Sequence, residues 1–147
     1  MPQARDLVIA GKDREALRLY EQIVALDPRN GVAHFRIVSL SWKLLPGWKM
    51  DVPAERKQAQ WLINIAFSSL HMLDKLDRGG TLLERHLFRG LLNAHLYRQD
   101  KSEELRVVAE RELQRFVDQM KANKKGDDPN VDLARRWLAR VKKKKKN

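Results

Sequence analysis

The residue types best suited to catalysis or metal binding are sparse in this chain. Its 147 residues include no cysteine, which excludes thiol catalysis, zinc–thiolate sites and disulfides. The four histidines, at positions 34, 71, 86 and 95, show neither i, i+4 pairing with one another nor an HExxH context. We find no glycine-rich phosphate loop, GxSxG elbow or paired carboxylates. The sequence therefore predicts a protein that is not an enzyme, with no catalytic residue, no metal and no cofactor.

Basic residues instead gather at the C-terminus. The net charge is +11, and residues 135–147 hold eight basic residues and no acid. These are Arg135, Arg136, Arg140, Lys142, Lys143, Lys144, Lys145 and Lys146. Such a cluster can contact nucleic-acid phosphates, an anionic membrane surface or an acidic protein segment, and a solvated tail without a specific partner is equally compatible. Because Trp137 and Leu138 predict a helix that docks on the body, we assign only residues 142–147 to a basic lysine tail.

The four tryptophans offer a second chemistry, the stacking of single-stranded bases. Trp61 and Trp137 fall on apolar stripes, so we expect both to be buried. Trp48 lies in the proline-bounded segment PGWKMDVP and has no evident core role. It could cover a helix end or form an exposed contact.

The elements that must position these residues are all predicted to be helical. Apolar residues recur at helical spacing in six segments, and no segment alternates as a strand would. Proline, glycine and asparagine separate the segments, and Asp13, Ser102 and Asp128 are suited to cap them. We expect helices at about 13–27, 32–45, 53–76, 82–98, 103–120 and from 129 onwards, with residues 4–10 as a shorter preceding helix.

The composition predicts one soluble globular domain, since 33% of the residues are charged and 43% are hydrophobic. The N-terminus shows no apolar run of signal-peptide length, and the longest apolar-rich stretch is too short for a bilayer core of about 30 Å. We therefore expect a cytoplasmic protein without a transmembrane segment.

The segment GKDREALRLYEQIVALDP, from Gly11 to Pro28, resembles the second half of a tetratricopeptide repeat (TPR), a helix–turn–helix unit. Gly11 suits the tight turn, Ala16 permits close helix approach, Tyr20 fills the space beside it, and Pro28 stops the helix. A second repeat would begin near residue 31, and a third would run through LFRGLLNAHLYRQDKSEELRVVAERELQRF.

The resemblance implies an all-α fold in which antiparallel helix pairs stack as a short, irregular, right-handed TPR-like array. This single domain would cover residues 1–141, and the last helix would cap the array. An irregular helical bundle is the alternative.

In TPR proteins the first helix of each repeat lines a concave groove that holds a peptide. The resemblance places two sets of residues towards that groove: Phe35, Arg36, Ser39, Trp42 and Lys43 from the second repeat, and Arg85, His86, Arg89, Asn93 and Tyr97 from the third. Arg89 and Asn93 lie four residues apart on one helical face and could jointly grip a carboxylate or a peptide backbone. Phe35 and Trp42 are also candidates for the core.

The sequence thus predicts a protein–protein interaction module, as an adaptor, a chaperone-like protein or an assembly subunit, that binds an acidic peptide or helix in a concave groove. The alternative is a nucleic-acid-associated protein that binds phosphates through its basic C-terminal helix and tail. A role inside a larger assembly is a third possibility, because a shortened first repeat would leave an open edge for a neighbour to cover.

Overall fold

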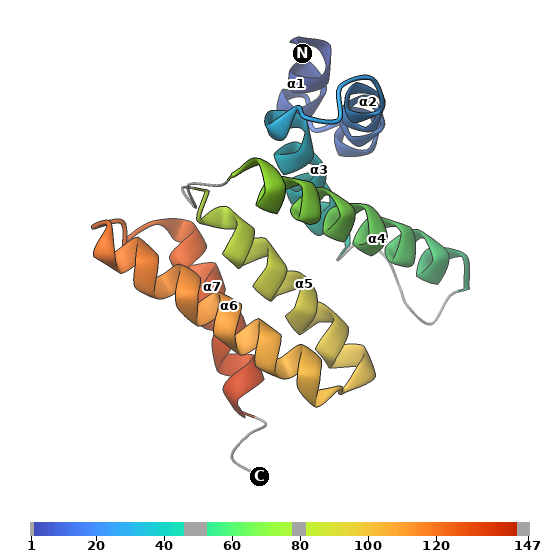
Figure 1. Ribbon diagram of the computed structural model, residues 1–147. Coiled ribbons are helices and arrows are strands. Elements are labelled where there is room, and N and C mark those ends of the chain that lie inside the picture. Colours follow the sequence, from blue (N-terminus) through green and yellow to red (C-terminus); the bar gives the residue numbers. More distant parts are fainter. Residues whose placement is uncertain (1, 46–52, 78–81, 144–147) are drawn as a thin grey trace. The chain divides into compact units, whose positions relative to one another are not determined.

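The computed structural model describes residues 2–45, 53–77 and 82–143, apart from the side chains of Pro2 and Lys143 (Figure 1). Trp48 and Lys144 to Lys146 therefore lie outside the described residues. The described residues form seven helices and no strand, which confirms the predicted all-α class. The helices are α1 (Pro2–Ile9), α2 (Asp13–Leu26), α3 (Gly31–Leu44), α4 (Pro53–Leu76), α5 (Glu84–Asp100), α6 (Glu103–Ala122) and α7 (Pro129–Lys143).

The helices begin and end close to the predicted residues, but the caps differ in detail. Asn30 caps α3, since its side chain accepts a hydrogen bond from the Ala33 amide at 3.0 Å. The cap predicted at Asp13 is wrong: Lys12 holds the N-cap position and Asp13 is the first helical residue. Ser102 does occupy the N-cap of α6, although its side chain makes no capping hydrogen bond.

Packing groups the helices into two compact units, Met1–Arg78 and Gly79–Asn147. In the first unit each helix packs on the next, α1 on α2, α2 on α3 and α3 on α4. In the second unit α6 packs on both α5 and α7, and α7 also contacts α5. In both units, helices that follow one another along the chain pack on each other.

The core of the first unit consists of the apolar stripes of α2, α3 and α4. Its fully or nearly buried side chains include Ala16, Leu17, Tyr20, Ile37, Val38, Leu62, Ala66 and Leu70. Ala16 is completely buried and Tyr20 nearly so, in keeping with the packing roles that their spacing predicted.

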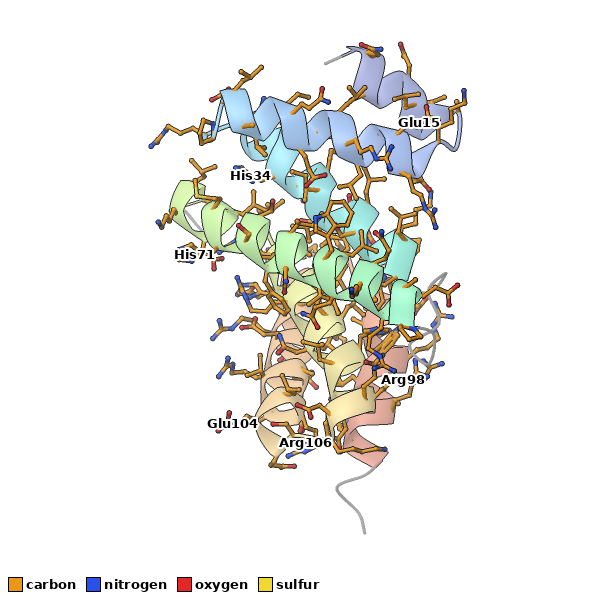
Figure 2. All side chains as sticks on the ribbon, turned by 90° about the vertical axis from the view of Figure 1, so that its right-hand side faces the viewer. Glu15, His34, His71, Arg98, Glu104 and Arg106 are labelled. Atoms are coloured by element: carbon orange, nitrogen blue, oxygen red, sulfur yellow. The ribbon has the colours of Figure 1, made fainter. Side chains whose placement is uncertain are left out.

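A buried histidine, labelled in Figure 2, ties three segments of this unit together. His34 Nε2 lies 2.8 Å from the Pro28 carbonyl oxygen, and Nδ1 lies 3.1 Å from Ser69 Oγ. Because a carbonyl can only accept, the ring donates to Pro28 from Nε2. The histidine therefore joins the α2–α3 turn to α4 and has a structural role.

In the second unit, a glycine of α5 lies close against α6. A Cβ atom built on Gly90 would lie 2.6 Å from Leu113 Cγ and 3.1 Å from the Leu113 backbone nitrogen. Leu113 is itself fully buried, so it has little room to move. The absence of a side chain at Gly90 is thus what permits this helix pair to pack.

We predict that Gly90→Ala lowers the free energy of unfolding by about 1–3 kcal/mol, because the added methyl group overpacks the α5–α6 interface. Urea unfolding followed by far-ultraviolet circular dichroism measures the change. Gly126→Ala is the matched control, since a Cβ atom there would lie 3.6 Å from Lys121 Cγ, at ordinary contact distance. Equal stability of the two variants would contradict the prediction.

Candidate partner-binding cleft

The predicted groove residues of α3 are only partly available to a partner. Arg36 is exposed, whereas Phe35, Ser39 and Trp42 are half-buried. The Ser39 hydroxyl donates to the Arg36 carbonyl at 3.2 Å. Lys43 is exposed, but its ammonium lies 3.1 Å from the Asp13 carboxylate at the start of α2. Lys43 thus already has an acidic neighbour within the unit.

The predicted residues of α5 are brought together with an acid on α6. His86 Nδ1 lies 2.6 Å from Glu112 Oε2, and Arg89 Nη1 lies 3.9 Å from Glu112 Oε1. Arg111 also approaches this carboxylate, at 3.7 Å. Two of the predicted groove residues therefore face a carboxylate of their own unit.

The other three predicted α5 residues point elsewhere. Asn93 is buried, and its amide donates to the Arg89 carbonyl at 2.7 Å, within the same helix. Tyr97 is also buried. Arg85 is half-buried and donates from Nε to the Leu82 carbonyl at 3.3 Å. Arg89 and Asn93 thus lie on one helix but direct their polar groups to different partners.

Glu112 is a buried carboxylate that the sequence reasoning missed. Burial alone would raise the pKa of Glu112, but the hydrogen bond with His86 and the charges of His86, Arg89 and Arg111 outweigh burial and hold the pKa below its usual value. Glu112 is therefore ionised at neutral pH and links α6 to α5 electrostatically. The only indication of this burial in the sequence is that Glu112 lies beside Leu113 on a helical stripe that is otherwise apolar.

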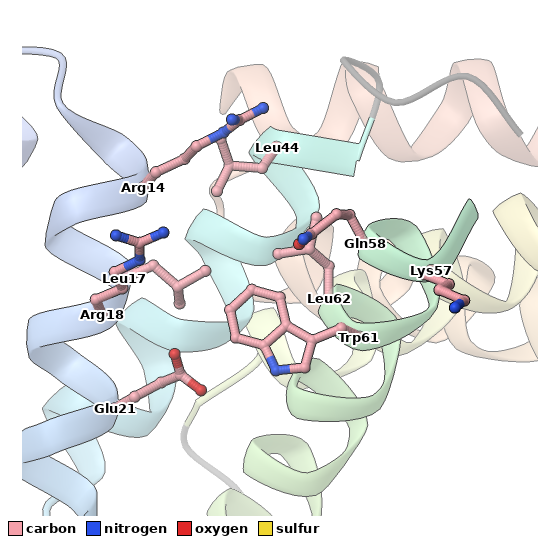
Figure 3. A pocket seen from close by; sticks show the side chains of 9 residues that line it. All are labelled: Arg14, Leu17, Arg18, Glu21, Leu44, Lys57, Gln58, Trp61 and Leu62. Carbon is pink, nitrogen blue, oxygen red and sulfur yellow. The ribbon is translucent and has the colours of Figure 1, made fainter. Parts of the chain in front are cut away.

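A cleft of about 540 Å³ lies in the first unit, between α2 and α4 (Figure 3). Its lining residues are Arg14, Leu17, Arg18, Glu21, Leu44, Lys57, Gln58, Trp61 and Leu62. Our expectation that Trp61 is buried is wrong, because 40% of the residue is exposed. The indole ring projects from α4 towards Leu17 and Glu21 of α2 (Figure 3).

Helical spacing places these side chains on facing surfaces. The residues of α2 that line the cleft lie three, four and seven positions after Arg14, so they share one face of the helix. On α4, Lys57 and Gln58 lie four and three positions before Trp61, and Leu62 directly follows it. Leu17 and Leu62 are buried and form the floor together with half-buried Leu44.

Charge around the cleft is mainly positive. Arg14, Arg18 and Lys57 contribute exposed cations, and Glu21 is the single acid in the lining. Burial raises the pKa of Glu21, and the Arg18 charge opposes that shift without cancelling it. An apolar floor with a cationic rim suits an acidic segment that also carries an apolar side chain.

The basic residues of α7 are placed along an exposed surface. Arg135, Arg136 and Arg140 are exposed, and Arg135 lies 3.8 Å from Asp132 one turn earlier. Lys142 donates to Gln114 Oε1 at 3.3 Å. The helix extends through Lys143, so the first two residues of the predicted tail are helical. Lysine has good helix propensity, and its charge is favourable at a helix C-terminus.

Among the described residues, no group of three or more histidine, aspartate or glutamate side chains is arranged to hold a metal ion. None of the described helices has the combination of length and apolarity needed to cross a membrane. Comparison with protein families, curated proteins and solved structures finds no match to this chain.

We predict that stability falls in acid in two steps. Burial, followed by the Arg98 charge, lowers the pKa of His95 below its ordinary value of 6.5. As the pH falls, the unfolded state therefore takes up this proton before the folded state does. Stability then declines as the pH falls below about 6.5. The folded pKa of Glu112 is also depressed, so its contribution is present above its ordinary pKa of 4.5 and is lost as pH falls through the folded value.

Glu112→Gln separates the two steps. At neutral pH we expect a loss of about 1–3 kcal/mol of unfolding free energy, because the cations around Glu112 lose their charged partner. Urea midpoints measured from neutral to acidic pH should show the difference from the wild type shrinking below the ordinary pKa of Glu112, while the earlier step due to His95 remains. Glu104→Gln, an exposed change on the same helix, is the control. A pH-independent difference would contradict the role assigned to Glu112.

Proposed function

We propose that this protein is an interaction module that binds an acidic peptide or helix of a protein partner, as an adaptor, a chaperone-like protein or an assembly subunit. The observation that supports it is the Trp61 cleft, in which an exposed indole ring lies over an apolar floor beside exposed cations. Large apolar surface left in water is unfavourable, so a half-exposed tryptophan in a cleft suits a residue that a partner covers.

The chemistry of the cleft favours a particular kind of partner. Tryptophan and arginine are the residues most often responsible for binding energy at protein interfaces. An apolar side chain of the partner would pack on Trp61 and Leu44, while its carboxylates would face Arg14 and Arg18. The positive net charge of +11 would speed the encounter with an acidic segment at low ionic strength.

We also propose that the helix pairs α1–α2 and α3–α4 correspond to two TPR-like repeats, with the resemblance centred on α2. In that assignment α2 and α4 are the second helices of their repeats. The Trp61 cleft then lies on a different face from the predicted groove, which the first helices would line. The proposed binding surface is thus the cleft between the second helices.

The test uses peptides selected by phage display on the full-length protein, with affinities measured by fluorescence anisotropy. We expect the selected peptides to be acidic and to contain apolar residues. Arg18→Glu should weaken their binding about 10-fold or more, because it removes one attraction and adds one repulsion. Trp61→Leu should weaken binding by a similar factor through the loss of an interface anchor.

Arg36→Glu is the matched control and also tests the earlier prediction of a groove on α3. Arg36 is exposed in the same unit, carries the same charge as Arg18 and does not line the cleft. If Arg36→Glu abolishes binding and Arg18→Glu leaves it unchanged, the partner lies on α3 and the cleft proposal fails. Selection of basic or neutral peptides would contradict the acidic class of partner.

A further inference from the structure

A second tryptophan lies beside a separate pocket, in the unit formed by α5, α6 and α7. The guanidinium carbon of Arg140 lies 5.1 Å from the centre of the Trp137 ring, and that of Arg98, labelled in Figure 2, lies 5.8 Å from it. Both distances fall within the range of cation–π attraction. The adjoining pocket has a volume of about 340 Å³ and is lined by Ala94, Tyr97, Arg98, Lys101, Trp137, Arg140 and Val141.

The pocket is built where the end of α5 meets α7. Trp137 packs against the buried cluster of Ala94, Ala109 and Val141 but remains partly exposed. The backbone amide of Lys101 closes α5 by donating to the Tyr97 carbonyl at 2.8 Å, with Lys101 in the left-handed region at φ 59°. The indole is therefore anchored on the apolar core while its polar surroundings come from two helices.

The charges that line this pocket differ from those that line the Trp61 cleft. Its lining includes three cations and no acid, whereas the Trp61 cleft includes Glu21. A volume of about 340 Å³ is at the small end of ligand pockets and suits a single planar group better than a helix. The combination is a flat aromatic ring with two guanidiniums lying over it.

We propose that the Trp137 pocket binds single-stranded nucleic acid: one base stacks on the indole in place of a guanidinium that lies over the ring in the free protein, and the neighbouring phosphates are held by Arg98, Lys101 and Arg140. Bases stack on aromatic side chains whatever their identity, and basic side chains follow the backbone. The carboxylates of an acidic peptide would also pair with these cations. A carboxylate is not a flat ring, however, and does not stack on Trp137 as a base does. The aromatic surface is therefore what favours a nucleic acid over a peptide.

The test uses the full-length protein and a fluorescein-labelled oligothymidylate of about 12 nucleotides, a length within the usual site size of such proteins. Fluorescence anisotropy gives the affinity at about 50 mM and about 200 mM salt, where phosphate contacts should weaken steeply. We expect Trp137→Leu to reduce affinity about 10-fold or more, because it removes stacking but keeps an apolar side chain. Tryptophan fluorescence should be quenched by the oligonucleotide in the wild type and much less in this variant.

Two arginines of α7 provide a matched pair. Arg140→Gln, inside the pocket, should weaken binding about 3-fold or more at low salt and make its salt dependence less steep. Arg136→Gln makes the same charge change at an exposed position of α7 that does not line the pocket, and it should change affinity less than about 2-fold. Circular dichroism checks that each variant is folded. If Trp137→Leu fails to fold, the comparison of Arg140→Gln with Arg136→Gln tests the proposal.

Several results would overturn the proposal. These are no binding, equal binding of a duplex of the same length, equal losses for Arg136→Gln and Arg140→Gln, or an unchanged affinity in folded Trp137→Leu. Full displacement of the oligonucleotide by an oligoglutamate of equal charge would show that the site takes acidic peptides instead.

The two proposed sites can be tested independently. Trp61→Leu should leave oligonucleotide binding unchanged, and Trp137→Leu should leave binding of the selected acidic peptides unchanged. The failure of one proposal is therefore distinguishable from the failure of the other. Loss of oligonucleotide binding in Trp61→Leu would place the strand in the Trp61 cleft and overturn the Trp137 assignment.

Discussion

The apolar stripe of each helix can leave water only by packing against another helix, and the rest of this structure follows from that constraint. Helices that follow one another along the chain pack on each other in both units, so stripes close in sequence share a core. Small residues set how closely they meet, and among the described glycines Gly90, against Leu113, has the least room for a side chain. Both candidate sites lie at the margins of such packed stripes, where an aromatic side chain is too large or too far round the helix to be fully covered.

Opposite charges inside each unit decide which cations remain for partners. His86 and Arg89 face Glu112, and Lys43 faces Asp13. These interactions fix one helix against another and reduce the field that the same residues would present to a ligand. Arg18 beside Trp61 and Arg140 beside Trp137 instead combine positive charge with exposed aromatic surface. The net charge of the chain is therefore a poor guide to where anions would bind.

The sequence predicted the helices well because their ends depend on local chemistry. Pro28 and Pro53 act on their own backbone, and the helical period of apolar residues marks which face is buried. Periodicity does not show where the buried face ends, so Trp61 was placed in the core although it lies at the edge. Asp13 was predicted as a cap from its side-chain type, but it is the first helical residue and its carboxylate contacts Lys43 of another helix, which no local pattern reveals.

The candidate sites were predicted less well for the same reason. Glu112 meets His86 across 26 residues of sequence, and the Trp61 cleft combines residues from three helices. Arg36 and Tyr97 were chosen from positions in a repeat, and the structure leaves the first exposed and the second buried. Such sets become visible only when tertiary packing brings separate helices together.

Lys101 shows what this arrangement costs the chain. A left-handed backbone at the end of a helix favours glycine, and a residue with a side chain there is less stable by about 1 kcal/mol. Replacing this lysine with glycine would make the second unit more resistant to unfolding. That exchange would also remove one of the three cations of the Trp137 pocket. The conformational strain and the pocket's charge therefore reside in one residue, and an engineered gain in thermal tolerance at this turn would come with a weaker anion site.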